Sequence, residues 1–283
     1  MRYAISFSNA GVCSDPRILA ELAQLAEQAS WDGIFLEDYI VHWSAPSTPT
    51  CDPWVALAAM AARTEHIRLG TMVTPLSRRR PWKLARETIT LDQLSNGRLI
   101  LGAGLGDIND PGFVKTGEVI DARQRAHMLD EALAILAGLW SGQPFAYQGE
   151  HYQIDEVTFL PGPVQSSRIP IWIGGAWPNS GPVRRAARWD GACLYHSTPD
   201  GSWQDMSPDD VRALKAAIQS QRTSSEPFDI SIGGRRRGED WEKERETIRS
   251  LAEAGATWWV EYVPPTDLGT LQQSTLRGPL RIE

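Results

Sequence analysis

The feature that most constrains the fold is a regular alternation of short apolar runs with longer amphipathic runs along the 283 residues. Short apolar runs are typical of buried strands, and runs with helical periodicity, such as Pro16–Gln28 and Ala122–Trp140, are typical of surface helices. The predicted strands are Tyr3–Phe7, Gly33–Leu36, Ile67–Val73, Leu99–Ala103, Ile169–Ile173, Ala192–Tyr195, Phe228–Ile232 and Thr257–Val263. Because strands and helices alternate, the sequence predicts a parallel sheet.

Strand–helix units of this number and chain length predict a closed (β/α)8 TIM barrel, formed as a single domain by residues 1–283. A doubly wound open sheet is the alternative, because a strand count from sequence is uncertain by one or two. Prolines and glycines interrupt the rhythm over residues 141–168. This segment predicts an excursion with a short hairpin after the fourth helix, Ala122–Trp140.

Composition bears mainly on partners and compartment. The formal net charge of −7 and the pI of about 5.3 argue against nucleic acid or an anionic membrane as the main partner. The cysteines, Cys13, Cys51 and Cys193, lie far apart without metal-ligand spacing, which predicts free thiols in a reducing compartment. We see no signal peptide or apolar run of about 20 residues, so we expect a cytoplasmic protein.

Glycine follows several of the predicted strands. These positions are Gly102–Gly106, Gly174–Gly175 and Gly233–Gly234. In a barrel of this type, functional groups gather at the carboxyl ends of the strands. Glycine lets a ligand approach the backbone closely, so this pattern favours an anionic cofactor at the mouth. Tight turns between strand and helix are the structural alternative.

Several catalytic motifs are missing. The histidines form neither an HxH nor an HExxH pair, so we predict no metal site, and no GxSxG motif is present. The GAGLGD segment at 102–107 does not complete the GxGxxG dinucleotide fingerprint. A glycine-rich, aromatic mouth with few ionisable groups favours a flat organic cofactor in a dry pocket over hydrolysis.

Three segments carry a resemblance to a known family. They are LGTMVTPLSRRRPWKLARETITLDQLSNGRLILGAGLG at 69–106, LDEALAILAGLWSG at 129–142 and PVQSSRIPIWIGG at 163–175. Together with WDGIFLEDY at 31–39, they resemble the luciferase-like flavin-dependent oxidoreductases over roughly residues 1–200. The family fold is a TIM barrel, in agreement with the strand count.

The resemblance implies reduced FMN, or the deazaflavin coenzyme F420, bound at the barrel mouth. It also implies a backbone bulge at the end of the third strand, with a non-proline cis peptide between Met72 and Val73. The cofactor phosphate would lie on Gly174–Ala176 and on a helix that begins at about Pro182. The cofactor-binding residues implied are Met72, Val73, Thr74, Gly104, Gly106, Gly174, Gly175, Ala176 and Trp177.

The implied catalytic residues are Asp38, Tyr39, His42 and Asp107. Many family members carry Asp-His where this chain has Asp38-Tyr39, and His42 is positioned to take the place of the missing histidine. Asp107 matches a position where deazaflavin-using relatives place a proton-donating carboxylate. We assign Trp43, Arg78, Arg235 and Arg236 to a rim for substrate or an anionic cofactor tail. The alternative for the arginine runs is a solvated surface.

The main hypothesis is an oxidoreductase acting on a small organic substrate, with reduced flavin and oxygen or with deazaflavin and hydride transfer. A reductase would supply the reduced cofactor, and the chain is expected to form a homodimer, as relatives often do. Two alternatives remain open. One is a non-catalytic flavin-binding barrel, and the other is a flavin-free barrel enzyme with a phosphate-bearing substrate.

Overall fold

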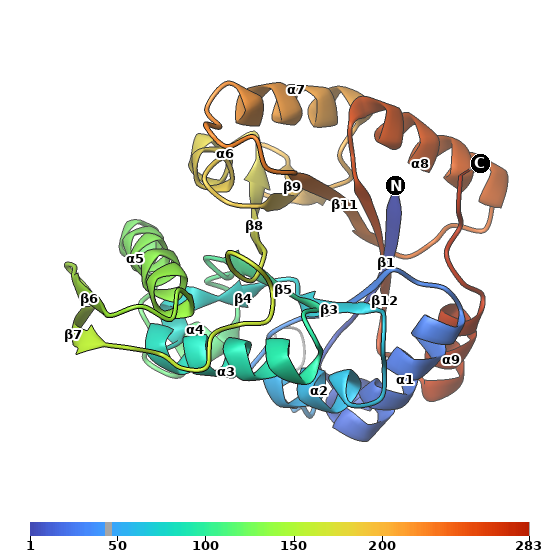
Figure 1. Cartoon of the computed structure of the whole chain (residues 1–283). Helices are drawn as coiled ribbons and strands as arrows, with labels where there is room; N and C mark the ends of the chain where they lie inside the picture. The colour runs from blue at the N-terminus through green and yellow to red at the C-terminus, as the bar shows by residue number, and fades with distance from the viewer. Residues whose placement is uncertain (43–46, 283) are drawn as a thin grey trace.

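A computed structural model describes residues 1–42 and 47–282. Its strands form a closed parallel ring, visible in Figure 1, in which each strand pairs with the next and the last pairs with the first. In ring order the strands are β1 (Arg2–Phe7), β2 (Gly33–Leu36), β3 (Arg68–Thr71), β5 (Leu99–Gly104), β8 (Ile171–Trp177), β9 (Gly191–Ser197), β11 (Asp229–Arg235) and β12 (Trp258–Val263). Pairing of β12 with β1 confirms the predicted barrel and excludes the open sheet.

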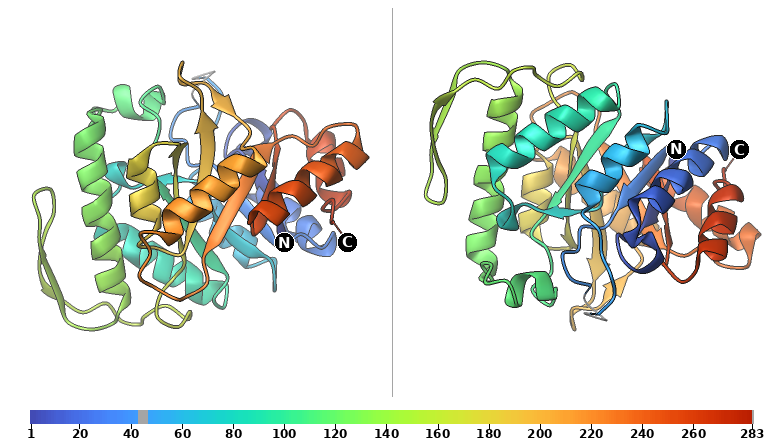
Figure 2. Two further views of the ribbon diagram at one scale, coloured as in Figure 1. Left: turned by 90° about the horizontal axis from the view of Figure 1, so that it is seen from above. Right: turned by 90° about the horizontal axis from the view of Figure 1, so that it is seen from below.

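Helices surround the ring on its outside (Figures 1 and 2). They are α1 (Pro16–Gln28), α2 (Pro53–Ala61), α3 (Pro81–Leu94), α5 (Ala122–Trp140), α6 (Ser180–Ala186), α7 (Pro208–Gln219), α8 (Trp241–Ala254) and α9 (Leu268–Leu276). Their starts follow local chemistry. The carboxylates of Asp15, Asp52 and Asp121 each accept a hydrogen bond from a backbone N–H in the first turn.

The predicted third strand, Ile67–Val73, is interrupted in the structure. β3 ends at Thr71, a cis peptide joins Met72 to Val73, and β4 (Thr74–Pro75) then pairs with β5 alone. The cis peptide lies where the resemblance placed it. Two further elements were not predicted: α4 (Pro111–Val114) after β5, and β10 (Trp203–Gln204) antiparallel to β9.

The excursion after α5 does form a hairpin. β6 (Phe145–Gln148) and β7 (Gln153–Val157) pair antiparallel, as the turn residues predicted. Both views in Figure 2 show the hairpin on the outer side of α5, away from the barrel.

Large side chains fill the barrel interior below the mouth. The rings of Phe35, Trp172 and Trp258 lie 5.3 to 6.2 Å apart and pack with Ala4, Ile100 and Val260. Residues that alternate with these on the strands, such as Ile34 and Ile173, belong instead to the core between barrel and helices. This alternation identifies which side chains at the strand ends face the mouth.

Two further expectations can be checked. Cys13, Cys51 and Cys193 are all free thiols. Among the described residues, no helix is long and apolar enough to cross a membrane.

Candidate functional site

The bend after β3 determines the shape of the barrel mouth. A Cβ atom built on Gly104 would lie 2.7 Å from Val73 Cγ2, and one built on Gly174 would lie 2.7 Å from Val73 Cγ1. Such distances are shorter than real Cβ contacts, so both strands need glycine to accommodate Val73. Gly104 and Gly174, both predicted to contact a cofactor, are therefore needed for packing against Val73. Together they form a cradle around its side chain.

The turn expected at Gly174-Gly175 is not a turn. β8 continues to Trp177, and Gly174 to Trp177 pair with Cys193 to His196 of β9. A Cβ on Gly175 would lie 2.6 Å from Pro182 Cγ, so this glycine lets α6 pack against the strand. α6 begins at Ser180 rather than Pro182, which moves the implied phosphate position toward Asn179.

Alternation along β2 turns Glu37 toward the mouth. Phe35 belongs to the interior cluster and Leu36 to the outer core, so the next side chain faces inward. Burial raises the pKa of the Glu37 carboxyl, and the nearby Ser8 hydroxyl offsets part of that shift. No cation within the described residues forms an ion pair with Glu37. The sequence analysis missed it because the resemblance pointed to Asp38, although the alternation gave a signal.

Two tyrosines share the mouth with Glu37. Tyr262 faces inward because Trp258 and Val260, on the same face of β12, belong to the interior cluster. Burial and then the charge of Glu37 raise the pKa of both Tyr39 and Tyr262. Both phenols therefore stay protonated and can donate a hydrogen bond at neutral pH.

The mouth also holds the Ser8 hydroxyl. Ser8 is fully buried beside Glu37, and its hydroxyl favours the charged form of that carboxyl, although burial has the larger effect. The interior Cys193 thiol is a different case, because burial raises its pKa to about 12 and leaves it a neutral, unreactive group.

Asp38, in contrast, faces away from the mouth and is saturated with partners. Its carboxylate accepts hydrogen bonds from the Thr74 hydroxyl at 2.8 Å and from Arg79 Nη2 at 2.7 Å. Arg78, with a fully buried side chain, lies 3.5 Å from the same carboxylate and 2.6 Å from Asp110. Burial alone would lower the pKa of Arg79, but the carboxylate of Asp38 outweighs that effect and raises the pKa overall. Arg78 therefore lies inside this network and not on the expected rim.

Tyr39 is held by its backbone. The buried Asn9 side chain donates to the Tyr39 carbonyl at 2.8 Å and accepts from the Tyr39 N–H at 3.1 Å, while it also donates to the Cys51 carbonyl. The His42 ring packs edge-on against the Tyr39 ring, with centroids 5.7 Å apart. The structure thus places His42, the candidate for the missing histidine's role, beside Tyr39, which stands where many family members carry that histidine.

The remaining predicted residues are dispersed around the rim. Asp107 is exposed and its carboxylate accepts from the N–H and side-chain amide of Asn109, as a loop-capping aspartate does. Gly106 has a φ of +74° and packs on Phe113. The Trp177 indole donates to Asp210 at 3.0 Å, at the start of α7, so the ring lies outside the interior.

The two arginines at the end of β11 differ in their partners. Arg235 is the last residue of the strand, and Arg236 follows it. Arg235 pairs with Asp205 at 2.7 Å and with Glu244 at 3.0 Å. Arg236 is exposed. Trp43, also assigned to the rim, lies outside the described residues.

The geometry defines a closed (β/α)8 barrel with an inward-facing carboxyl and tyrosines at its mouth, next to a bulged third strand. The model of the luciferase-like monooxygenase family matches residues 4–234, so the chain belongs to that family.

Known relatives agree on the type of cofactor. The chain is 35% identical over 168 residues to the F420-dependent glucose-6-phosphate dehydrogenase of Microbacterium testaceum, and 33% identical to that of Nakamurella multipartita. Each match covers 58% of this chain and 48% of the relative, so the alignment spans about half the length of these curated relatives.

Solved structures share the whole fold at low identity. An F420-dependent secondary alcohol dehydrogenase in complex with an F420–acetone adduct has a TM-score of 0.77 at 16% identity over 99% of both chains. The coenzyme F420-dependent tetrahydromethanopterin reductase of Methanopyrus kandleri has a TM-score of 0.74 at 16% identity over 98% of both chains. The monooxygenase RslO1 of Streptomyces bottropensis has a TM-score of 0.71 at 19% identity, covering 97% of this chain and 96% of its own.

Proposed function

We propose that this chain is a deazaflavin-dependent oxidoreductase that acts on a hydroxyl-bearing or carbonyl-bearing small molecule. The fit of Val73 between Gly104 and Gly174 carries the proposal, because it gives the mouth the shape that the family resemblance implies for a flavin-type ring. The names of the relatives favour deazaflavin over FMN. When bound, a deazaflavin accepts or gives a hydride.

The residues at the bend would hold the cofactor ring. Met72 and Val73 present their backbone and side chains at the mouth, and the Thr74 hydroxyl ties the segment to Asp38 from behind. Gly104, Gly174 and Ala176 would line the other side. The contacts of Gly106, Gly175 and Trp177 with a cofactor stay predictions, since each of these residues has a packing partner in the protein.

Glu37 is the residue we assign to proton transfer. A carboxyl whose pKa is raised by burial titrates nearer to neutral pH, which suits general acid–base work. It would take the hydroxyl proton of the substrate during oxidation and return it during reduction. Tyr39 and Tyr262, both protonated, would donate hydrogen bonds to the substrate oxygen and orient it.

Fewer arginines are available to bind a ligand at the rim than the sequence predicted. Arg236 is the exposed arginine after β11 and would meet an anionic substrate group or the glutamate tail of the cofactor. Arg235 contributes less, because two carboxylates already pair with it. A supplying reductase, a homodimer and a cytoplasmic location stay predictions.

The test is an anaerobic titration with reduced deazaflavin coenzyme and, separately, with reduced FMN, followed by intrinsic tryptophan fluorescence. We expect tight, saturable binding of deazaflavin and weaker binding of FMN. Tight binding of FMN alone would replace the proposal with an oxygen-using monooxygenase. Binding of neither would favour the flavin-free barrel enzyme and would make Arg236 essential.

Turnover separates an enzyme from a binding protein. Deazaflavin bound without hydride transfer to or from any of a panel of alcohols, sugar phosphates and ketones would favour the non-catalytic alternative. The change in deazaflavin absorbance gives the readout.

A further inference from the structure

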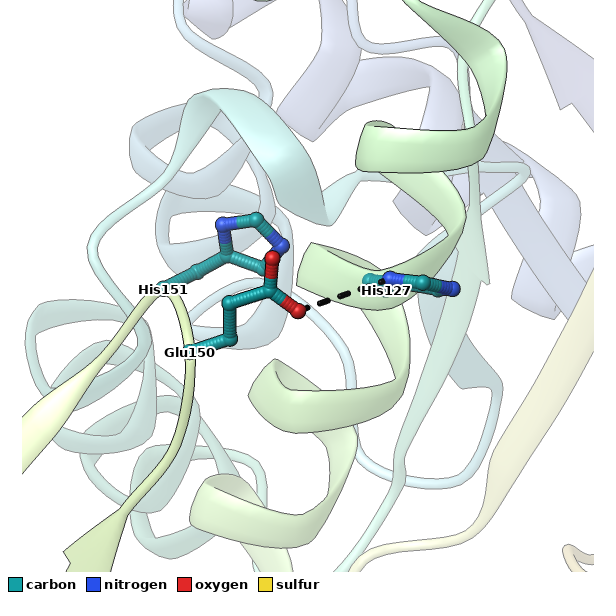
Figure 3. Close-up of side chains that lie close together, drawn as sticks. All are labelled: His127, Glu150 and His151. Atoms are coloured by element: carbon teal, nitrogen blue, oxygen red, sulfur yellow. Dashed lines mark ion pairs between the residues drawn. The ribbon is translucent and has the colours of Figure 1, made fainter.

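A second polar site lies outside the barrel, where the hairpin meets α5. His127 of α5 and Glu150 and His151 of the hairpin loop bring one potential ligand atom each within 4.8 Å of one another (Figure 3). His127 Nδ1 lies 3.8 Å from Glu150 Oε2. Sequence spacing did not reveal this cluster, because one histidine is on the helix and the other follows the first strand of the hairpin.

The cluster is built on a fixed scaffold. Glu131 lies one turn after His127 on the same face of α5, and its carboxylate accepts hydrogen bonds from the backbone N–H groups of Glu150, His151 and Tyr152 at 2.9 to 3.1 Å. A Cβ on Gly149 would collide with that carboxylate, so the loop depends on glycine for its close approach. The loop is thereby tied to the helix independently of the cluster itself.

The chemistry of the three side chains fits a divalent transition ion. Two imidazoles and one carboxylate form a common three-residue ligand set for Zn²⁺, with water as the fourth ligand. Tetrahedral coordination at about 2.1 Å separates ligand atoms by about 3.4 Å. The ligand atoms here lie within 4.8 Å of one another, and His127 Nδ1 lies 3.8 Å from Glu150 Oε2, so the side chains must move closer together to bind an ion. His151 Nε2 is buried and has no hydrogen-bond partner among the described residues, as a nitrogen reserved for another ligand would be.

Exposure leaves room for the ion and its water. The side chain of His127 is 48% exposed and that of Glu150 is 74% exposed, so both have space to move toward the ion. The negative charge of Glu131 beneath the loop adds attraction for a cation.

We propose that His127, Glu150 and His151 bind one Zn²⁺ ion, which joins the hairpin to α5. The site does not depend on the cofactor or on the reaction at the barrel mouth. Its expected effect is structural: an ion that binds only the folded chain stabilises it and reduces opening of the hairpin.

The experiment uses the full chain, freed of metal by EDTA and then desalted, and titrated with zinc chloride by isothermal titration calorimetry. We expect one ion per chain with a dissociation constant in the micromolar range. His127→Ala and His151→Ala should each weaken binding about tenfold or more. A Co²⁺ titration should give the visible absorbance of a tetrahedral site in the unmodified chain but not in His127→Ala or His151→Ala.

The matched control is His66→Ala. His66 lies 3.9 Å from Glu65, and both side chains are more than four-fifths exposed, but they form no described group of three ligands. Binding should be unchanged in this variant. Zinc should raise the melting temperature of the unmodified chain and of His66→Ala, but not that of His127→Ala.

Gly149→Ala gives a second, independent test. It leaves all three ligands in place but should force the loop away from Glu131, and so weaken zinc binding as a ligand substitution does. No binding at about 100 μM zinc, unchanged affinity in His127→Ala, or one ion per two chains would each overturn the site.

Discussion

The inner and outer faces of the barrel mouth use charge in opposite ways. On the inner face, Glu37 has no ion-pair partner among the described residues, and its pKa is raised by burial. On the outer face, the very next residue, Asp38, is held by Thr74, Arg78 and Arg79. One step along the chain separates a carboxyl free for chemistry from a carboxylate committed to structure.

The contrast between Glu37 and Asp38 shows how a functional carboxyl can be recognised in this barrel. A charge that is paired in the protein stabilises the loops it connects and has little left to offer a substrate. A partly buried carboxyl without a partner destabilises the fold when charged, which natural proteins tolerate mainly at functional sites. The comparison can be tested by exchanging or removing each kind of group.

The largest expected effect is on turnover in Glu37→Gln. Removal of a general acid–base group lowers the rate by about 10² to 10⁴-fold, while cofactor binding should be nearly unchanged. Steady-state kinetics with deazaflavin and a fluorescence titration measure the two quantities. If Asp107→Asn abolishes turnover and Glu37→Gln does not, the proton-transfer role belongs to the exposed loop and our assignment is wrong.

The next effect is on stability in Asp38→Asn. The substitution removes the buried carboxylate that pairs with Arg79 and leaves this guanidinium only the half-exposed carboxylate of Asp52, at 3.7 Å. Breaking a buried ion pair costs about 3–5 kcal/mol. Urea denaturation measures this loss. The control, Asp209→Asn, removes the exposed pair with Arg212 and should cost less than about 1 kcal/mol. Equal losses in both variants would contradict the distinction between the faces.

A smaller effect is expected when the inner face is overfilled. Gly104→Ala places a methyl group against Val73 and should cost about 1–3 kcal/mol of stability, with weaker cofactor binding. Val73→Ala in the same chain removes the methyl groups that clash. A double-mutant cycle should therefore show coupling between the two positions. Additive losses would mean that Gly104 has some other role.

The smallest effect is the dependence of stability on pH at Glu37. Its folded pKa is raised above the unfolded value, so the folded state binds the proton more tightly. The stability contributed by this group is present in acid and falls as pH rises through the raised pKa. Glu37→Gln lacks this decline, so its stability relative to the unmodified chain should increase as the pH rises above 4.5, the ordinary pKa of a glutamate. Parallel pH profiles would show that Glu37 is not desolvated.

The sequence predicted the barrel because each strand and each helix shows its own periodicity of buried apolar residues. The cis peptide at Met72–Val73 also followed, from a stretch that closely resembles the family. The position of Arg78 was not predicted, because it depends on a partner that lies far away in the sequence. Arg78 looked like a rim residue because its buried partner Asp110 comes from a loop far along the chain.

The second feature that the sequence analysis did not predict is the direction in which side chains point. Trp177 was placed in the mouth because β8 was expected to end early, whereas the longer strand points this residue toward Asp210. For Glu37, alternation along Ile34–Leu36 was readable, but the family resemblance drew attention to Asp38. Strand alternation near the mouth is therefore a more direct guide to chemistry than motif matching alone.

Closure of the ring by β12 against β1 also has a consequence for biosynthesis. Tyr262 reaches the mouth from β12, the last strand of the ring along the chain, while Glu37 directly follows β2, one of the first. A nascent chain therefore carries its carboxyl long before the opposite wall exists. The complete proposed site forms only when β12 closes the ring against β1.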